Sequence, residues 1–159
     1  MGEVVSREAL AMRVKDAHGS GRTVAFANGC FDLLHVGHVR YLEAARSLGD
    51  ALVVGINGDD STRKLKGDGR PINNERDRAE VIAALACVDL VTIFPEVRAV
   101  RFLEMARPDI YVKGGDYTVD TLDKSERVVL EQIAAEIRII PFQKGYSTSG
   151  VIGKLRESK

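Results

Sequence analysis

Two of the chain's three histidines, His35 and His38, stand three residues apart with Gly37 between them. They follow an apolar segment (23–27) that is typical of a strand, and they begin an amphipathic segment (36–48) that is typical of a helix. Residues three apart share a helix face, and a helix N-terminus presents unpaired N–H groups and a positive dipole end to anions. The run therefore predicts a phosphate site with two imidazoles, in which Gly37 lets a phosphate approach the backbone.

Imidazoles at such a site can donate hydrogen bonds to phosphate oxygens whose charge grows during phosphoryl or nucleotidyl transfer. Two other interpretations remain open: a helix cap beside a surface histidine, or a zinc site. Zinc-binding histidines on one helix are usually four residues apart, and no third ligand is near in the sequence. Cys30 and Cys87 do not form a CxxC pair, so we expect no protein metal site and no disulfide framework.

Basic residues gather in the polar stretch 57–76, which we predict to be a mobile loop over the site. Lys64 and Lys66 can neutralise phosphate groups there, or they belong to a solvated basic loop. Arg78 lies near the start of a predicted helix (74–86), where its charge opposes the helix dipole. We therefore expect either a ligand or a neighbouring acid to hold Arg78.

Two further polar segments each follow a predicted strand. In Gly114-Gly115-Asp116-Tyr117, the carboxylate could hold a sugar hydroxyl, a metal or only its own turn. Ser147 and Thr148 resemble an N-cap that opens the last helix, and two adjacent hydroxyls suit a second phosphate cradle. The chain contains no Walker A, GxGxxG or GxSxG motif and offers no evident protein nucleophile. This favours direct attack by one substrate's phosphate on the α-phosphate of a nucleotide.

The elements that must position these residues alternate along the chain. Apolar runs predict five strands, at 23–27, 51–56, 90–94, 110–113 and 137–140. Helical patterns occupy 6–18, 36–48, 74–86, 97–106, 124–135 and 147–156. The alternation predicts an α/β fold, with a Rossmann-like, doubly wound, five-stranded parallel sheet covered by helices on both faces. Ligands of such sheets bind outside the carboxyl ends of the strands, where all the motifs should converge.

Composition limits the classes of partner. A chain of 159 residues fits one domain, with an N-terminal helix over 1–20 and a catalytic core over 21–155. The net formal charge is zero, so charge gives no reason to expect nucleic acid or a membrane surface as a partner. The start lacks the pattern of a signal peptide, and the apolar runs are too short to span a bilayer. With two unpaired cysteines, this predicts a cytoplasmic protein.

The stretch from Asn28 to His38 resembles the signature of the HxGH nucleotidyltransferases. The likeness continues through 49–50, 88–89, 113–117 and 145–148, and covers about 21–155. Within that superfamily, 28–30, 65–71 and 113–117 are most similar to the adenylyltransferase domain of ADP-heptose synthesis. Glycerol-3-phosphate cytidylyltransferases are similar at 31–35 and Arg78, but their last motif usually begins with an arginine where this chain has Phe142. The usual Ser-Thr-Thr is here Ser147-Thr148-Ser149.

The resemblance implies a homodimer that transfers AMP from ATP, accompanied by Mg²⁺, to D-glycero-D-manno-heptose 1-phosphate, giving ADP-heptose and pyrophosphate. A cytidylyltransferase, or an enzyme acting on another phosphorylated acceptor, is the alternative; a non-catalytic nucleotide-binding regulatory domain is another. Residue by residue, the resemblance implies catalytic roles for His35, His38 and Lys66. It implies nucleotide binding by Cys30, Phe31, Gly37, Arg78, Gly115, Asp116, Ser147 and Thr148, and acceptor binding by Lys64, Asp32 and Tyr117.

Overall fold

A computed structural model of the chain describes residues 1–115, 117–141 and 145–157. Six parallel strands form its sheet in the order β1-β4-β3-β2-β5-β6. Their bounds are β1 Glu3–Val4, β2 Val24–Gly29, β3 Ala51–Asn57, β4 Leu90–Phe94, β5 Ile110–Gly114 and β6 Glu136–Ile140. From β2 the chain builds outward through β3 and β4, then returns to place β5 and β6 on the other side of β2. The strand order therefore reverses between β2 and β5, which is where ligands of such sheets bind.

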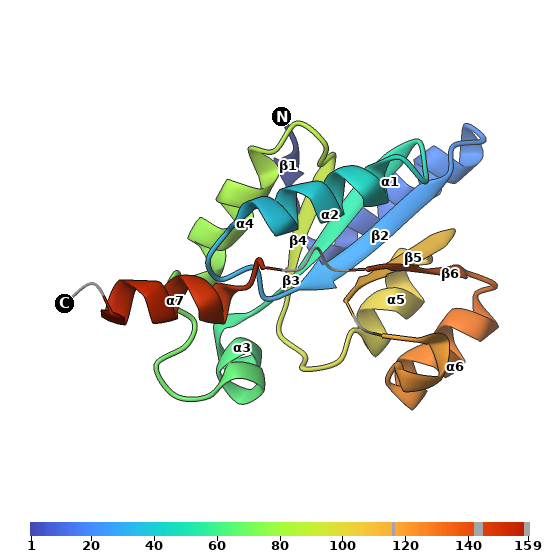
Figure 1. Cartoon of the computed structure of the whole chain (residues 1–159). Helices are drawn as coiled ribbons and strands as arrows, with labels where there is room; N and C mark the ends of the chain where they lie inside the picture. The colour runs from blue at the N-terminus through green and yellow to red at the C-terminus, as the bar shows by residue number, and fades with distance from the viewer. Residues whose placement is uncertain (116, 142–144, 158–159) are drawn as a thin grey trace.

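Helices cover both faces of the sheet (Figure 1). Their bounds are α1 Arg7–Gly19, α2 Val36–Arg46, α3 Asp59–Lys66, α4 Glu75–Ala83, α5 Val100–Ala106, α6 Lys124–Gln132 and α7 Thr148–Glu157, with a 3₁₀ turn at Val119–Thr121. One apolar cluster joins α2 and α4 to the sheet, and a second joins α1, α5 and α6 to the opposite face. Side chains of β2 alternate between them, with Ala25 and Ala27 in the first and Val24 and Phe26 in the second. Every residue of β3 is buried.

The predicted α/β fold is confirmed, and each of the five predicted strands is present within two residues of its expected bounds. The described sheet has six strands rather than five, because the short β1 pairs with β4. The prediction of a loop over 57–76 was wrong in part, since α3 occupies Asp59–Lys66. The buried residues of this helix, Ser61 and Thr62, are polar, so no apolar period marks it in the sequence.

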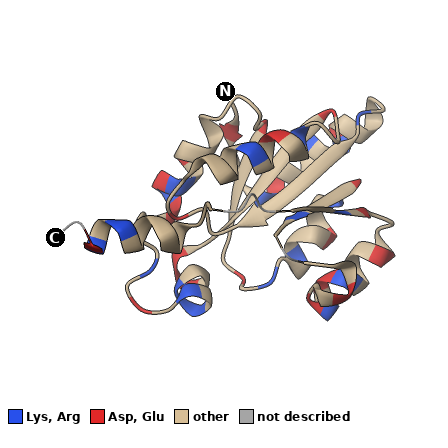
Figure 2. Ribbon diagram, viewed as in Figure 1, with Lys and Arg blue, Asp and Glu red and all other residues tan. Residues whose placement is uncertain are grey.

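Helix α7 stands apart from the two apolar clusters. It extends away from the sheet in Figure 1, and none of its residues is buried. Lysine and arginine are interspersed with aspartate and glutamate along the visible ribbon (Figure 2). Among the described residues, no helix has the length and apolar character needed to cross a bilayer.

Candidate active site

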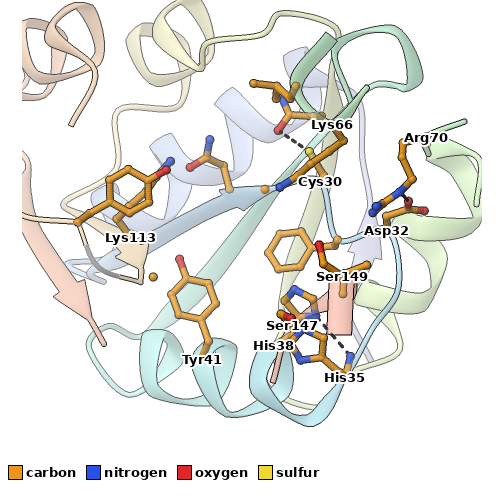
Figure 3. A pocket seen from close by; sticks show the side chains of 18 of the residues that line it. Cys30, Asp32, His35, His38, Tyr41, Lys66, Arg70, Lys113, Ser147 and Ser149 are labelled. Atoms are coloured by element: carbon orange, nitrogen blue, oxygen red, sulfur yellow. Dashed lines mark hydrogen bonds and ion pairs between the residues drawn. The ribbon is translucent and has the colours of Figure 1, made fainter. Parts of the chain in front are cut away.

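A cavity of about 550 Å³ opens where the carboxyl ends of β2 and β5 diverge (Figure 3). Its walls come from the ends of β2, β3 and β5, from the starts of α2 and α7, and from α3 and α6. Most of the residues named from sequence line it: Cys30, Phe31, Asp32, His35, His38, Lys66, Tyr117, Ser147 and Thr148. The four segments that were expected to converge are therefore neighbours in space.

The histidine pair lies at the N-terminus of α2, as the sequence predicted. His35 is the N-cap residue in extended conformation, and His38 lies on the first helical turn. Their rings stack with centroids 3.8 Å apart. The backbone N–H of His35 donates to Nδ1 of His38 across 3.4 Å. Because Nδ1 accepts this bond, the proton of the neutral His38 ring lies on Nε2.

The pKa values of both histidines are lowered, which favours the neutral rings at pH 7. Burial, assisted by the nearby charges of His35 and Lys66, lowers the pKa of His38 to about 4. Burial also lowers the pKa of His35. The pair therefore supplies uncharged N–H donors to the cavity rather than a general acid that is charged at rest.

Phe31 fixes the position of His38 from the other side. Its φ of 46° is in the left-handed region, which a bulky residue adopts only when its surroundings hold it there. Its ring meets the His38 ring edge-on, with centroids 5.4 Å apart. A Cβ on Gly29 would lie 3.1 Å from the Phe31 ring, so glycine makes room for this conformation. Phe31 thus both lines the cavity and supports a histidine.

Asp32 was expected to bind the acceptor, but both oxygens of its carboxylate already accept hydrogen bonds from other residues of the chain. It accepts Nε of Arg70 at 2.5 Å and the N–H groups of Ile72 and Asn73 at 2.8 and 3.0 Å. Burial would raise the pKa of Asp32, but these N–H groups and Arg70 outweigh it and hold the pKa low. The charge of Asp32 therefore anchors the loop after α3, and these contacts give it a positioning role.

Arg78, which was expected to bind nucleotide, does not line the cavity. Its side chain is 1% exposed, and it donates to the carbonyl oxygens of Cys30 and Asn73 at 2.5 and 2.9 Å and to Asp59 at 2.8 Å. An acid thus holds the guanidinium, but it is Asp59, rather than Glu75, Asp77 or Glu80, which lie closer in the sequence. Arg78 is a positioning residue that ties α4 to the turn carrying Phe31.

The two lysines of α3 differ in position. Lys66 lines the cavity near His38, whereas Lys64 does not line it.

Gly37 also lies outside the cavity lining. A Cβ at this position would lie 3.0 Å from the His35 ring and 3.0 Å from the Cβ of Tyr146, so these two residues occupy the space that a side chain would need. Its lack of a side chain therefore serves the packing of His35. The expected acceptor role of Lys64 and the expected phosphate contact of Gly37 have no support in this geometry.

Ser147 and Thr148 join α7 to the cavity. Ser147 Oγ accepts the N–H of Gly150 at 3.0 Å, which makes it the cap predicted for this helix. Thr148 Oγ1 donates to the carbonyl of Leu33 at 3.3 Å. Ser149 lines the cavity beside them. The N-termini of α2 and α7 therefore both border the cavity, and the positive ends of their helix dipoles favour an anion there.

Sequence reasoning missed several lining residues on the opposite side, where β5 ends. Lys113, Glu126 and Asn28 line the cavity there, next to Tyr117. Asn28 and Lys113 begin the stretches 28–38 and 113–117 that resemble the family, but neither was given a role. Glu126 stands inside a predicted helix, so its position signalled no site. Gly115 is buried, and its N–H continues the sheet by donating to Ile140 at 3.0 Å. Asp116, expected to bind nucleotide, and Phe142 lie outside the described residues.

Known proteins resemble the chain at the level of sequence and of fold. Residues 26–154 match the family described as cytidylyltransferase-like. The chain is 46% identical to the bifunctional protein HldE of Nitratiruptor sp. over 149 residues, which cover 94% of this chain and 31% of the relative. It is also 46% identical to HldE of Citrifermentans bemidjiense over 156 residues, which cover 98% of this chain and 32% of that relative. The chain thus spans about a third of the length of these curated relatives.

Two solved structures share the fold. A lipopolysaccharide core biosynthesis protein from Thermoplasma volcanium superposes with a TM-score of 0.65 at 30% identity, covering 80% of this chain and all of that one. Pantoate-beta-alanine ligase from Francisella tularensis superposes with a TM-score of 0.60 at 14% identity, covering 94% and 70%. The second likeness concerns the fold alone.

Proposed function

The chain belongs to the cytidylyltransferase-like family of nucleotidyltransferases, and from that premise we propose that it transfers AMP from ATP to a sugar 1-phosphate, D-glycero-D-manno-heptose 1-phosphate. In this reaction a phosphate oxygen of the acceptor attacks the α-phosphorus of ATP. A new phosphorus–oxygen bond forms, the bond from the α-phosphorus to its bridging oxygen breaks, and pyrophosphate leaves with that oxygen. The products are ADP-heptose and pyrophosphate, with no covalent enzyme intermediate.

The single observation that carries this proposal is the neutral, stacked histidine pair in one cavity with Lys66 and the N-terminus of α7. Negative charge builds on the α-phosphate and on the bridging oxygen as the reaction proceeds. Donors that are held in place before the reaction stabilise that charge without having to reorganise. Nε2–H of His38 is such a donor, and Lys66 adds a mobile positive charge. The two helix N-termini can bind the β- and γ-phosphates.

Magnesium would accompany ATP in this scheme. Within the described residues, no group of three or more His, Cys, Asp or Glu side chains could hold a metal ion. The carboxylates at the cavity are engaged elsewhere: Asp32 by Arg70, and Glu126 by the backbone N–H of Ala99 at 2.8 Å. Mg²⁺ would therefore be held by triphosphate oxygens and water, a coordination it often adopts.

The choice of acceptor and base rests on similarity. Identity of 46% to HldE proteins and the resemblance at 28–30, 65–71 and 113–117 support ATP and a heptose phosphate. The Thermoplasma volcanium neighbour is named as a lipopolysaccharide core biosynthesis protein, which agrees with a sugar acceptor. A glycerol-3-phosphate cytidylyltransferase is the second candidate, because the family that matches most of the chain is cytidylyltransferase-like.

A matrix of nucleoside triphosphates against phosphorylated acceptors, read as pyrophosphate release, tests the proposal. We expect ATP with heptose 1-phosphate to give the highest kcat/KM, and the variant His38→Ala to serve as the inactive control. A higher value for CTP with glycerol 3-phosphate would overturn the acceptor and the base. Nucleotide binding without pyrophosphate release in any pair would point to a regulatory domain. Sedimentation of the same preparation tests the homodimer that we also propose.

A further inference from the structure

The cavity contains a second lysine whose role the proposed mechanism does not use. Lys113 is the fourth residue of β5 and lines the cavity. Figure 3 shows it at the end of the cavity away from Arg70 and Asp32, with the histidine pair between them. Lys66, by contrast, lies close enough to His38 for its charge to lower that histidine's pKa. The two lysines therefore approach the cavity from separate elements, α3 and β5.

Aromatic and hydroxyl groups, rather than a carboxylate, hold the Lys113 ammonium. Nζ lies 3.4 Å from the hydroxyl oxygen of Tyr111, and 5.9 and 5.4 Å from the ring centroids of Tyr111 and Tyr117. Such ring contacts stabilise a cation without neutralising it. Within the described part of the chain, no carboxylate lies within ion-pair distance of Nζ. Burial lowers the pKa of Lys113, and the charge of Glu126 opposes that shift.

The other charged side chains near Lys113 are already engaged. Glu126 accepts the N–H of Ala99 and lies 3.4 Å from the Tyr111 hydroxyl. Arg98 pairs with Asp123 at 3.2 Å. A partly desolvated ammonium that faces a cavity without a paired carboxylate is favourable chiefly when an anionic ligand arrives.

The transfer reaction brings two anions together. The acceptor phosphate must approach the α-phosphate of ATP against the repulsion of like charges. The histidine pair, Lys66 and the starts of α2 and α7 already surround the space for the triphosphate. We propose that Lys113 binds the phosphate group of the acceptor and holds it for attack. This inference rests on the proposed nucleotidyl transfer, and it assigns the carboxyl end of β5 to a phosphomonoester rather than to the nucleotide.

Lys113→Met tests the assignment, because methionine retains an unbranched apolar stem and removes the charge. We expect kcat/KM for the acceptor to fall about 10- to 150-fold, the range for losing a hydrogen bond to a charged group. The Kd of a non-hydrolysable ATP analogue, measured by calorimetry without acceptor, should change less than about twofold. Lys113→Arg should restore part of the acceptor kcat/KM. Lys124→Met is the matched control, since Lys124 is exposed on α6 outside the cavity.

The outcomes separate this inference from the proposed function. If Lys113→Met weakens the ATP analogue and leaves the acceptor KM unchanged, Lys113 belongs to the nucleotide site and the inference is wrong, while nucleotidyl transfer stands. Equal loss in the Met and Arg variants, with a lower melting temperature in both, would assign a structural role instead. If the wild-type protein releases no pyrophosphate with any acceptor, the proposed function itself fails.

Discussion

His38 shows how one residue can be a strong donor without being charged. Its Nδ1 is occupied by the N–H of His35, so the free proton is on Nε2. Burial keeps the ring neutral, with a pKa of about 4. A neutral donor near triphosphate oxygens binds the ground state more weakly than a cation would. A larger share of the stabilisation that this donor provides is therefore gained in the transition state, where the charge on the phosphate oxygens grows.

Removing either imidazole should slow the chemical step. We expect His35→Ala and His38→Ala each to lower kcat by about 10²- to 10³-fold, because each removes a preorganised donor to the reacting phosphates. Pyrophosphate release under saturating substrates measures this. His18→Ala is the control, since His18 pairs with Asp109 away from the cavity. Turnover near the wild-type value in either cavity variant would remove the histidines from the mechanism.

The neutral state of His38 also makes the fold sensitive to acid. Its folded pKa of about 4 lies below the ordinary histidine value of 6.5, so the unfolded chain takes up a proton first as the pH falls. This histidine therefore costs folding free energy progressively from about pH 6.5 down to about pH 4. Urea unfolding of the wild type and His38→Gln at pH 6.5, 5.5 and 4.5 measures the effect. The wild type should lose more stability than the variant, and a difference that does not change with pH would contradict the shift.

At the scale of elements, the sequence predicted what an apolar pattern can encode. The run at 51–56 is continuous and apolar, and the run at 90–94 is apolar except for Thr92; they became β3 and β4. Helix α3 was missed because Ser61 and Thr62, rather than apolar residues, are its buried positions. The short β1 was missed because Glu3 and Val4 are exposed and their pairing with β4 joins distant parts of the chain.

For the site, too, the sequence predicted the positions of the segments but not the contacts of individual side chains. Its loops could be placed at the strand ends, since parallel strands share one carboxyl edge. What Asp32 and Arg78 bind could not be known, because their partners at Arg70 and Cys30 lie 38 and 48 positions away along the chain. In the sequence, a charged residue in a motif looks the same whether it contacts a ligand or hydrogen-bonds to the protein backbone.

Arg78 should therefore affect stability as well as activity. Arg78→Met leaves the carbonyl oxygens of Cys30 and Asn73 without their donor and Asp59 without its cation. We expect the free energy of unfolding to fall by about 2–5 kcal/mol, because each buried acceptor left without its donor costs about 1–3 kcal/mol. Urea denaturation checks this, with Arg76→Met as the control on the exposed side of α4. A change below about 0.5 kcal/mol, typical of surface substitutions, would show that the Arg78 contacts contribute little.

At the scale of the whole molecule, the cavity is completed by helix α7, none of whose residues is buried. The Thr148 hydroxyl reaches Leu33, and the Arg40 guanidinium lies 5.8 Å from the centroid of the Tyr146 ring. Val151 and Leu155 on α7 are 37% and 64% exposed. Since no residue of α7 is buried, a ligand that bridges the N-termini of α2 and α7 should stabilise this helix.

Hydrogen exchange should report that bridge. We expect a non-hydrolysable ATP analogue to slow amide exchange across α7 (Thr148–Glu157) at least about tenfold, because binding lowers the population of the opened helix. AMP, which lacks the β- and γ-phosphates, serves as the matched ligand and should protect α7 much less. The buried strand β3 should exchange at the same rate in both cases. Equal protection of α7 by AMP and by the triphosphate analogue would show that the terminal phosphates do not reach it.

The separation of α7 from both apolar clusters has an evolutionary consequence. The residues that hold the sheet together and the residues at the start of α7 that line the cavity belong to different parts of the chain. Substitutions at the exposed positions of α7 should therefore cost little folding stability. Under the proposed function, α7 is a region in which contacts to the nucleotide can change while the core stays constant.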